Sequence, residues 1–193
     1  DTKEHLTKSG ISYFGAGSDI SEAMRPYWIN ENFALFGFCQ FGKPYLNQIC
    51  VASDEKAGVN PLTLENIECC LDILREGQRA LLYFHWGREH VSTPEHGDIV
   101  LAKKVLEDDR VVAIIGMHAH RPQGMVKVKD KVGFMCLGNF LFPNFYIKSP
   151  TQLFYPKQLA KKPRYITRIY GKVFNVTYKR WKFINRVSQL VYF

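Results

Sequence analysis

Three short apolar runs along the chain predict the buried strands of a sheet. They cover Phe33–Cys39, Ala80–Phe84 and Val111–Ile115. Each run is shorter than an ordinary helix and lacks the strict alternation of a half-exposed strand, so we expect each strand to be covered on both faces. The second run leads directly into His85, which is typical of a central strand whose carboxyl end opens into a polar site.

Shorter patterns predict a fourth strand and a hairpin. Ile11–Phe14 has the composition of a short strand. Met125–Lys129 and Gly133–Leu137 flank the polar pair Asp130 and Lys131, and two such runs around a polar turn are typical of a β-hairpin.

Apolar residues at helical spacing predict two amphipathic helices between the strands. In the first, we expect Asn60 to cap the helix, Pro61 to take the first helical position, and Gly77 to mark its end. The second is expected to begin at Thr93 and Pro94. Its core-facing residues are predicted to be Ile99, Ala102, Val105 and Leu106.

The amino-terminal residues predict two short helices. Thr2–Ser9 is predicted to be the end of a helix that is closed by Gly10, which adopts a left-handed cap at low cost. Ser18–Met24 reads as a brief helix with Ser18 as its N-cap and a stop before Pro26. Strands and helices therefore alternate along the chain, which predicts an α/β fold with a functional site at the carboxyl ends of the strands.

Charge divides the 193 residues into two parts. Residues 146–193 contain 11 Lys and Arg and no acidic residue, whereas residues 1–145 contain 15 basic and 18 acidic residues, a net charge of −3. Acidic residues are absent from residue 146 onward, so we predict a boundary near Pro143–Pro150, with a domain over 1–145 and a basic, aromatic-rich extension over 146–193. The 46% apolar content excludes wholesale disorder, and no run approaches the ~20 apolar residues that span a bilayer.

The cysteines argue against both a disulfide framework and a zinc knuckle. There are five, an odd number, and no two have the C-x-x-C spacing. We expect buried free thiols.

Histidines supply the candidate chemistry. His85 directly follows one apolar run, and His118 and His120 follow another. An H-x-H pair on extended backbone places both imidazoles on one side, where they can bind one metal centre together with an imidazole from a neighbouring strand. His5 and His96 fall on predicted helices and are interpreted as ordinary surface or core residues. For His90 neither interpretation is favoured.

Three ordered motifs give the chain a family resemblance. They are His85-Trp86-Gly87-Arg88-Glu89, Gly116-Met117-His118-Ala119-His120-Arg121-Pro122-Gln123-Gly124 and Leu137-Gly138-Asn139-Phe140-Leu141-Phe142. Together with Gly15-Ala16-Gly17 and Glu22-Ala23-Met24-Arg25-Pro26, they resemble the CapA/PgsA family of capsule and poly-γ-glutamate synthesis proteins. The resemblance covers about residues 1–142 and is specific because several motifs recur in order.

The resemblance implies a calcineurin-like metallophosphoesterase fold, an α-β-β-α sandwich with a two-metal site at the strand ends. His85, His118 and His120 map onto its metal ligands and are candidate catalytic residues. The metals would be divalent Mn, Fe, Zn or Mg, which polarise a phosphoryl or acyl oxygen and activate a water. Glu89 and Asn139 are further candidate catalytic residues that would position substrate or support the ligands, although Asn139 also suits a turn.

The chain departs from the family pattern in several places. The motifs that contribute a metal-bridging Asp and an Asn-His pair have no counterpart, so the chain resembles a member that lacks its N-terminal segment. Three imidazoles without a bridging carboxylate would hold two metals poorly. Ala119, Cys136 and Pro143 replace the family's usual Pro, Ser and Asp.

Three functions stay open from the sequence. The first is a cell-envelope, membrane-associated and extracytoplasmic protein that acts on an anionic polymer such as poly-γ-glutamate or capsular polysaccharide. The second is a non-catalytic scaffold that binds the polymer or a membrane-bound synthase through the basic extension, and the third is a general metal-dependent phosphodiesterase. The extension could also contact an anionic membrane. Nucleic acid is a less favoured partner, because the residues that carry the motifs are net acidic.

Overall fold

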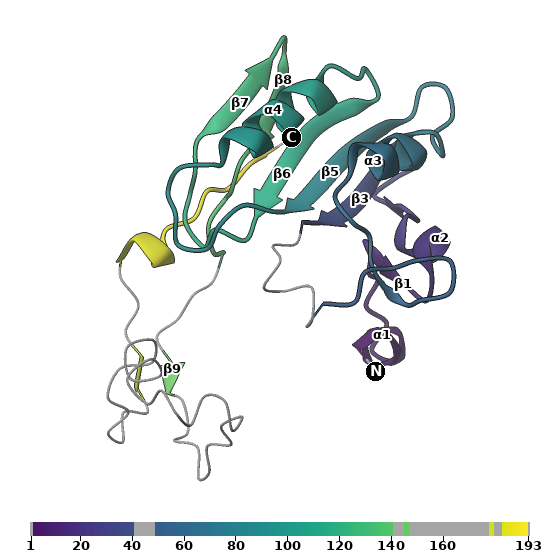
Figure 1. Cartoon of the computed structure of the whole chain (residues 1–193), viewed down its shortest axis with the longest axis horizontal. Coiled ribbons are helices and arrows are strands. Elements are labelled where there is room, and N and C mark those ends of the chain that lie inside the picture. Colours follow the sequence, from purple (N-terminus) through teal and green to yellow (C-terminus); the bar gives the residue numbers. More distant parts are fainter. Residues whose placement is uncertain (1, 41–48, 141–144, 147–177, 180–182, 193) are drawn as a thin grey trace, which may run out of the picture.

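The computed structural model describes residues 2–40, 49–140, 145–146, 178–179 and 183–192 and confirms the α/β class. Its main feature is a six-stranded sheet in the order β2-β3-β5-β6-β8-β7 (Figure 1). Four inner strands run parallel, and β2 and β7 pair antiparallel at the edges. The bounds are β2 Tyr27–Trp28, β3 Phe33–Cys39, β5 Arg79–His85, β6 Val111–Met117, β8 Lys131–Phe134 and β7 Met125–Val128. The three predicted central strands are confirmed.

Smaller elements accompany this sheet. Two antiparallel ribbons pair β1 with β4 and β9 with β10. The described residues therefore contain one large sheet, and a second large sheet, which the predicted sandwich needs, is not among them. The bounds are β1 Ala16–Gly17, β4 Gly58–Val59, β9 Phe145–Tyr146, β10 Tyr178–Lys179, α1 Thr2–Lys8, α2 Ile20–Ala23 and the 3₁₀ turn Phe183–Arg186.

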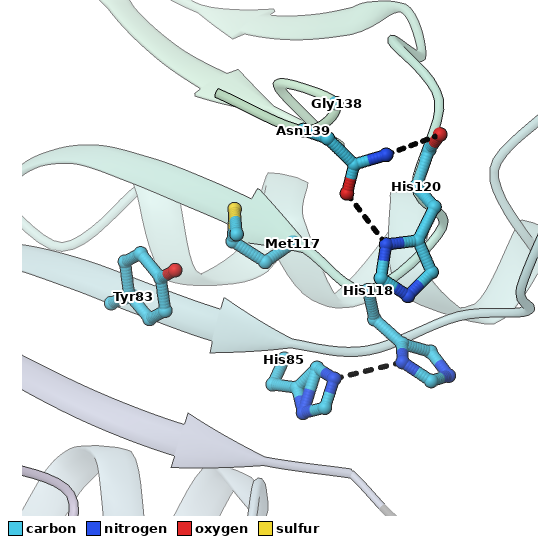
Figure 2. A pocket seen from close by; sticks show the side chains of 7 residues that line it. All are labelled: Tyr83, His85, Met117, His118, His120, Gly138 and Asn139. Carbon is cyan, nitrogen blue, oxygen red and sulfur yellow. Dashed lines mark hydrogen bonds between the residues drawn. The ribbon is translucent and has the colours of Figure 1, made fainter. Parts of the chain in front are cut away.

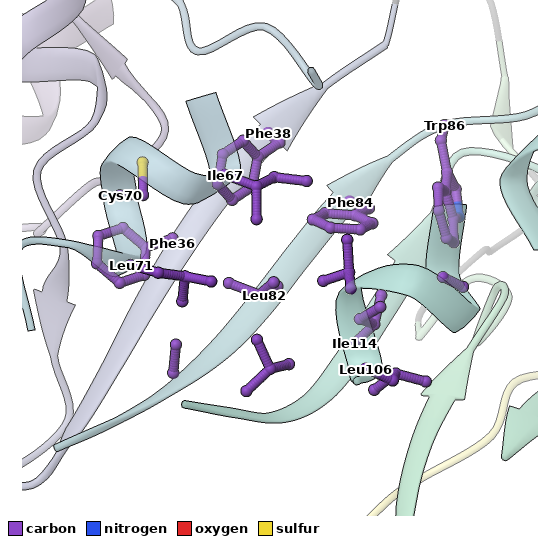
Figure 3. Packing of buried hydrophobic residues seen from close by; sticks show 14 of the residues in the cluster. Phe36, Phe38, Ile67, Cys70, Leu71, Leu82, Phe84, Trp86, Leu106 and Ile114 are labelled. Atoms are coloured by element: carbon purple, nitrogen blue, oxygen red, sulfur yellow. The ribbon is translucent and has the colours of Figure 1, made fainter. Parts of the chain in front are cut away.

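Two helices, α3 (Leu64–Leu71) and α4 (His96–Leu106), cover one face of the sheet (Figures 1 and 3). Phe84, from the middle of the sheet, packs edge-on against the rings of Phe38 and Trp86, with centroids 5.5 and 4.9 Å away. Ala102, Val105 and Leu106 are buried as predicted. This core fixes the strand ends that carry the histidines.

The other face of the sheet is covered at its centre by Phe14. Its ring meets that of Tyr83 edge-on at 6.0 Å, and a Cβ at Gly37 would lie 2.8 Å from the Phe14 ring. Glycine at position 37 therefore makes room for this segment. The predicted strand over Ile11–Phe14 is wrong, because these residues lie across the face and the strand β1 begins at Ala16.

The helix N-caps differ from the predictions. Asp19, not Ser18, caps α2, and its carboxylate accepts from the Glu22 N–H at 2.8 Å. Thr63, not Asn60, caps α3, which ends at Leu71 rather than at Gly77. Local pattern places a helix but leaves several polar residues able to cap it.

The later elements also shift slightly from the predicted bounds. Helix α4 begins at His96 after Glu95 rather than at Thr93 and Pro94. The β7–β8 hairpin is confirmed, but Lys131 belongs to β8. Its turn uses Lys129 in the left-handed region, with φ 55°.

All five cysteines are free thiols. Cys70 and Cys136 are buried as predicted, whereas Cys39 is half-buried and the expectation of burial is wrong for Cys50 and Cys69, which are exposed. No helix within the described ranges is long and apolar enough to cross a membrane. Most of the predicted extension 146–193 lies outside the described residues.

Asn60 has a structural role in place of the predicted cap. It is fully buried, and its amide donates to the carbonyl of Gly37 at 3.1 Å and accepts from the Asn66 side chain at 3.2 Å. Asn60→Ala should lower the free energy of unfolding by about 1–3 kcal/mol, because buried polar groups lose their partners. Urea denaturation measures this loss. Asn66→Ala removes only the half-buried partner of Asn60 and should lower the free energy of unfolding by less. If Asn60→Ala were as stable as wild type, the structural role of Asn60 would be contradicted.

Candidate functional site

A pocket of about 240 Å³ lies at the carboxyl ends of β5 and β6 (Figure 2). Four of the five predicted site residues line it, namely His85, His118, His120 and Asn139. Glu89 does not line it. The remaining lining residues are Tyr83, Met117 and Gly138.

Strand register brings the histidines together. β5 and β6 are parallel neighbours, with His85 opposite Met117. Residues that follow one strand therefore meet the end of the other at the same edge of the sheet. His85 ends β5, and His118 comes directly after β6, so the predicted convergence of imidazoles from two strands is confirmed.

A close approach of three chain segments fixes this edge. The Trp86 indole N–H donates to the carbonyl of Met135 at 2.8 Å. A Cβ at Gly116 would lie 2.0 Å from that carbonyl oxygen and 2.6 Å from the indole nitrogen. Only glycine lets β6 pass between them, and this explains the glycine that precedes Met117 and the histidine pair.

The H-x-H pair does not lie on extended backbone, so that detail of the prediction is wrong. His118 and His120 have φ of 95° and 54°, in the left-handed region that most residues avoid. Buried Ala119 between them accepts a hydrogen bond from the His90 N–H at 2.8 Å, which holds the turn. The two imidazoles still reach one pocket, with ring centroids 6.3 Å apart.

His85 and His118 contact each other directly. His85 Nε2 lies 2.8 Å from His118 Nδ1, and His85 Nδ1 lies 3.4 Å from the sulfur of Cys39 (Figure 2 shows the histidine pair). Burial lowers the pKa of His85, and the neighbouring imidazoles lower it further. Burial also lowers the pKa of His118, although the negative charge of Glu89 acts to raise it. A neutral pair can share one proton between the facing nitrogens.

Asn139 fixes the tautomer of His120. Its amide nitrogen donates to two carbonyls, those of His120 at 3.2 Å and Asn185 at 2.8 Å. The amide oxygen must then face His120 Nδ1, 2.6 Å away, and accept a hydrogen bond from its N–H (Figure 2). His120 Nε2 is then the unprotonated nitrogen of the ring, which is the form of imidazole that binds metals.

His90 lies beside His120 and forms a histidine cluster with His85, His118 and His120. The sequence favoured neither interpretation of His90. Its ring lies 5.6 Å from that of His120, and its Nδ1 lies 2.8 Å from the amide of buried Asn185. Asn185 was missed from the sequence, because nothing local links position 185 to position 90. His5 and His96 lie on α1 and at the start of α4, as expected.

Two polar contacts support the loops around the pocket and were also missed. Buried Asp98 accepts from the Gln40 amide at 3.0 Å, and that amide oxygen accepts from the Gly87 N–H at 3.0 Å. Gln123 donates to the carbonyl of Val91 at 2.8 Å. The Gln40 side chain ties the loop after β5 to α4. The Gln123 side chain ties the loop after β5 to the loop after β6.

The donor set suits a divalent transition metal in type but not in number. Imidazole nitrogens are ordinary ligands of such metals, and the Asn139 contact prepares His120 Nε2 for this role. However, no carboxylate is among the described residues that line the pocket, and the described part of the chain contains no group of three or more His, Cys, Asp or Glu arranged to hold a metal. Two metals therefore do not fit these residues alone.

The lowered pKa values of His85 and His118 predict acid sensitivity. The unfolded chain binds these protons more readily, so stability is fully present above about pH 6.5, the ordinary value, and falls as the pH drops below it. Melting temperatures from pH 8 to 5, measured with chelator, should fall less steeply for His118→Asn than for wild type. If the melting temperatures of wild type and His118→Asn fell equally with pH, His118 would not be a source of the acid sensitivity.

Asn139 gives a second prediction. Asn139→Ala should release the Nδ1–H form of His120 into a mixture of tautomers, because its acceptor is gone. Asn139→Asp should keep that tautomer but lower stability, since a carboxylate cannot donate to the two carbonyls. Long-range ¹⁵N–¹H NMR of the imidazoles reads the tautomer, and an unchanged His120 signal in Asn139→Ala would refute the assignment.

Comparison with known proteins identifies the family that this site belongs to. A model of the bacterial capsule synthesis protein PGA_cap family matches residues 1–144. A capsule biosynthesis protein CapA of Bacillus anthracis is 26% identical over 148 residues, which cover 74% of this chain and 35% of that protein. The match to this relative spans about a third of the relative's length. The family match over residues 1–144 includes all three histidine and asparagine motifs. The resemblance predicted from those motifs is confirmed, and the chain belongs to the bacterial capsule synthesis protein family PGA_cap.

Proposed function

We propose that this protein handles an anionic cell-envelope polymer, poly-γ-glutamate or a capsular polysaccharide, during capsule synthesis, with the histidine pocket as its site. The observation that carries the proposal is the convergence of imidazoles from two parallel strands, in a chain of the capsule synthesis family. The family also supports a place in the cell envelope, and we extend this to membrane association outside the cytoplasm.

The proposed site holds a divalent metal, with His118 and His120 as ligands and His85 as a further ligand or as the partner of His118. The metal, when bound, would polarise a phosphoryl or acyl oxygen and activate a water. A second metal requires carboxylates from beyond the described residues. We accordingly propose that the sheet with α3 and α4 corresponds to one half of a metallophosphoesterase-like sandwich.

Charge supports an anionic polymer as the partner. The described residues lining the pocket include no carboxylate that would repel a polyanion. Residues 146–193 add 11 positive charges and no negative one. Lys and Arg attract polyanions over about one Debye length, ~8–10 Å at physiological salt, so this part of the chain would attract the polymer.

A non-catalytic scaffold is the second candidate function. It is favoured by the incomplete metal-ligand set in the described part of the chain. The scaffold would bind the polymer or a membrane-bound synthase through the basic residues 146–193 and would keep the pocket as a structural remnant.

A paired histidine variant separates these functions. His118→Ala with His120→Ala should abolish Zn²⁺ or Mn²⁺ binding in calorimetry and remove capsular polymer from the surface of a host that depends on this protein. His96→Ala, which removes an exposed imidazole from α4, is the matched control and should leave both unchanged.

Other results point elsewhere. Normal surface polymer from the paired variant would exclude the metal-dependent function and favour the scaffold. Retardation of poly-γ-glutamate by wild type but not by a variant whose basic residues in 146–193 are neutralised would support the scaffold further. Turnover of an aryl phosphodiester with Mn²⁺ and no effect on surface polymer would instead favour a general phosphodiesterase.

A further inference from the structure

The carboxyl-terminal residues return to the histidine pocket from outside the family match. That match ends at residue 144, yet the segment 183–189 lies against Leu137 and Gly138 (the yellow segment in Figure 1). Gly138 and Ser188 form an antiparallel bridge, and the Gln189 N–H donates to the carbonyl of Leu137 at 2.8 Å. We call residues 183–189 the closing segment.

The closing segment fits tightly against the pocket. A Cβ at Gly138 would lie 2.5 Å from the carbonyl oxygen of Val187, and Gly138 has φ of 81°. Glycine at this position therefore serves the approach of the closing segment as well as the turn before Asn139.

Asn185 makes the decisive contacts. It is 3% exposed, although the residues on either side of it, Ile184 and Arg186, are exposed. Its side-chain amide lies 2.8 Å from His90 Nδ1, and its main-chain carbonyl accepts from the Asn139 amide at 2.8 Å. Both contacts go to residues of the histidine cluster, not to the core.

These contacts act on two imidazoles at once. The Asn185 carbonyl is one of the two acceptors that orient the Asn139 amide, and that orientation sets the Nδ1–H tautomer of His120. The Asn185 side chain orients the ring of His90, which stands 5.6 Å from that of His120. Residues that support metal-binding imidazoles typically change metal affinity 10–100-fold when they are mutated.

We propose that the closing segment completes the histidine site and that Asn185 is a positioning residue for His90 and, through Asn139, for His120. The positioning itself stands on the contacts alone. Its effect on metal binding rests on the proposed function.

Two variants in the full chain separate the two contacts. Asn185→Ala removes only the side chain and should change the imidazole ¹⁵N signals of His90 while those of His120 stay close to wild type. Gln189→Pro removes the N–H that ties the closing segment to Leu137 and should change the signals of both histidines. Gln189→Ala is the matched control, because it keeps the N–H and alters only an exposed side chain.

Zinc calorimetry on the same proteins provides the second measurement. Gln189→Pro should bind Zn²⁺ about ten-fold more weakly than Gln189→Ala. If wild type binds no Zn²⁺ but the NMR signals change as expected, the metal proposal fails and the positioning stands. If both variants keep wild-type imidazole signals, the positioning inference is overturned whatever the metal affinity. Should Gln189→Pro fail to fold, Asn185→Ala against Gln189→Ala decides the matter through His90.

Discussion

The site depends on the close approach of three chain segments around Gly116. Trp86 follows β5, Gly116 lies in β6, and Met135 follows β8, and the indole-to-carbonyl hydrogen bond joins the outer two across the glycine. A Cβ at position 116 would lie 2.0 Å from the Met135 carbonyl oxygen, so a side chain there would force the segments apart. His85 and His118 lie within two residues of this point, so the distance between their imidazoles is set here.

The turns that carry the histidines are held at some energetic cost. Among the described residues, His90, His118 and His120 are three of the four non-glycine residues with positive φ. Such conformations typically cost about 1–3 kcal/mol each and persist only where the surroundings fix them. Here the His90 N–H to Ala119 carbonyl bond and the contacts of Asn139 fix them, and a cluster of this kind at strand ends is characteristic of functional sites.

The sequence predicted what depends on local pattern. Phe33–Cys39 is a strand with the predicted bounds, because an apolar run bounded by polar residues and shorter than an ordinary helix favours a buried strand. Cap positions could not be predicted, because Asn60 and Thr63 are both good N-caps and only tertiary burial of Asn60 separates them. The cluster was predicted by motif, but its geometry was not, because the left-handed turn at His118 and the contact of Asn185 come from non-local packing.

The electrostatics of the cluster connect this geometry to the proposed partner. Burial keeps His85 and His118 neutral near pH 7, and no carboxylate is among the described lining residues. A divalent ion held by neutral imidazoles keeps its positive charge, whereas one held by carboxylates is largely compensated. The ion would then draw its counter-charge from what it binds. A polyanion supplies that charge at every repeat, so a carboxylate-poor imidazole site favours an anionic polymer over a neutral one.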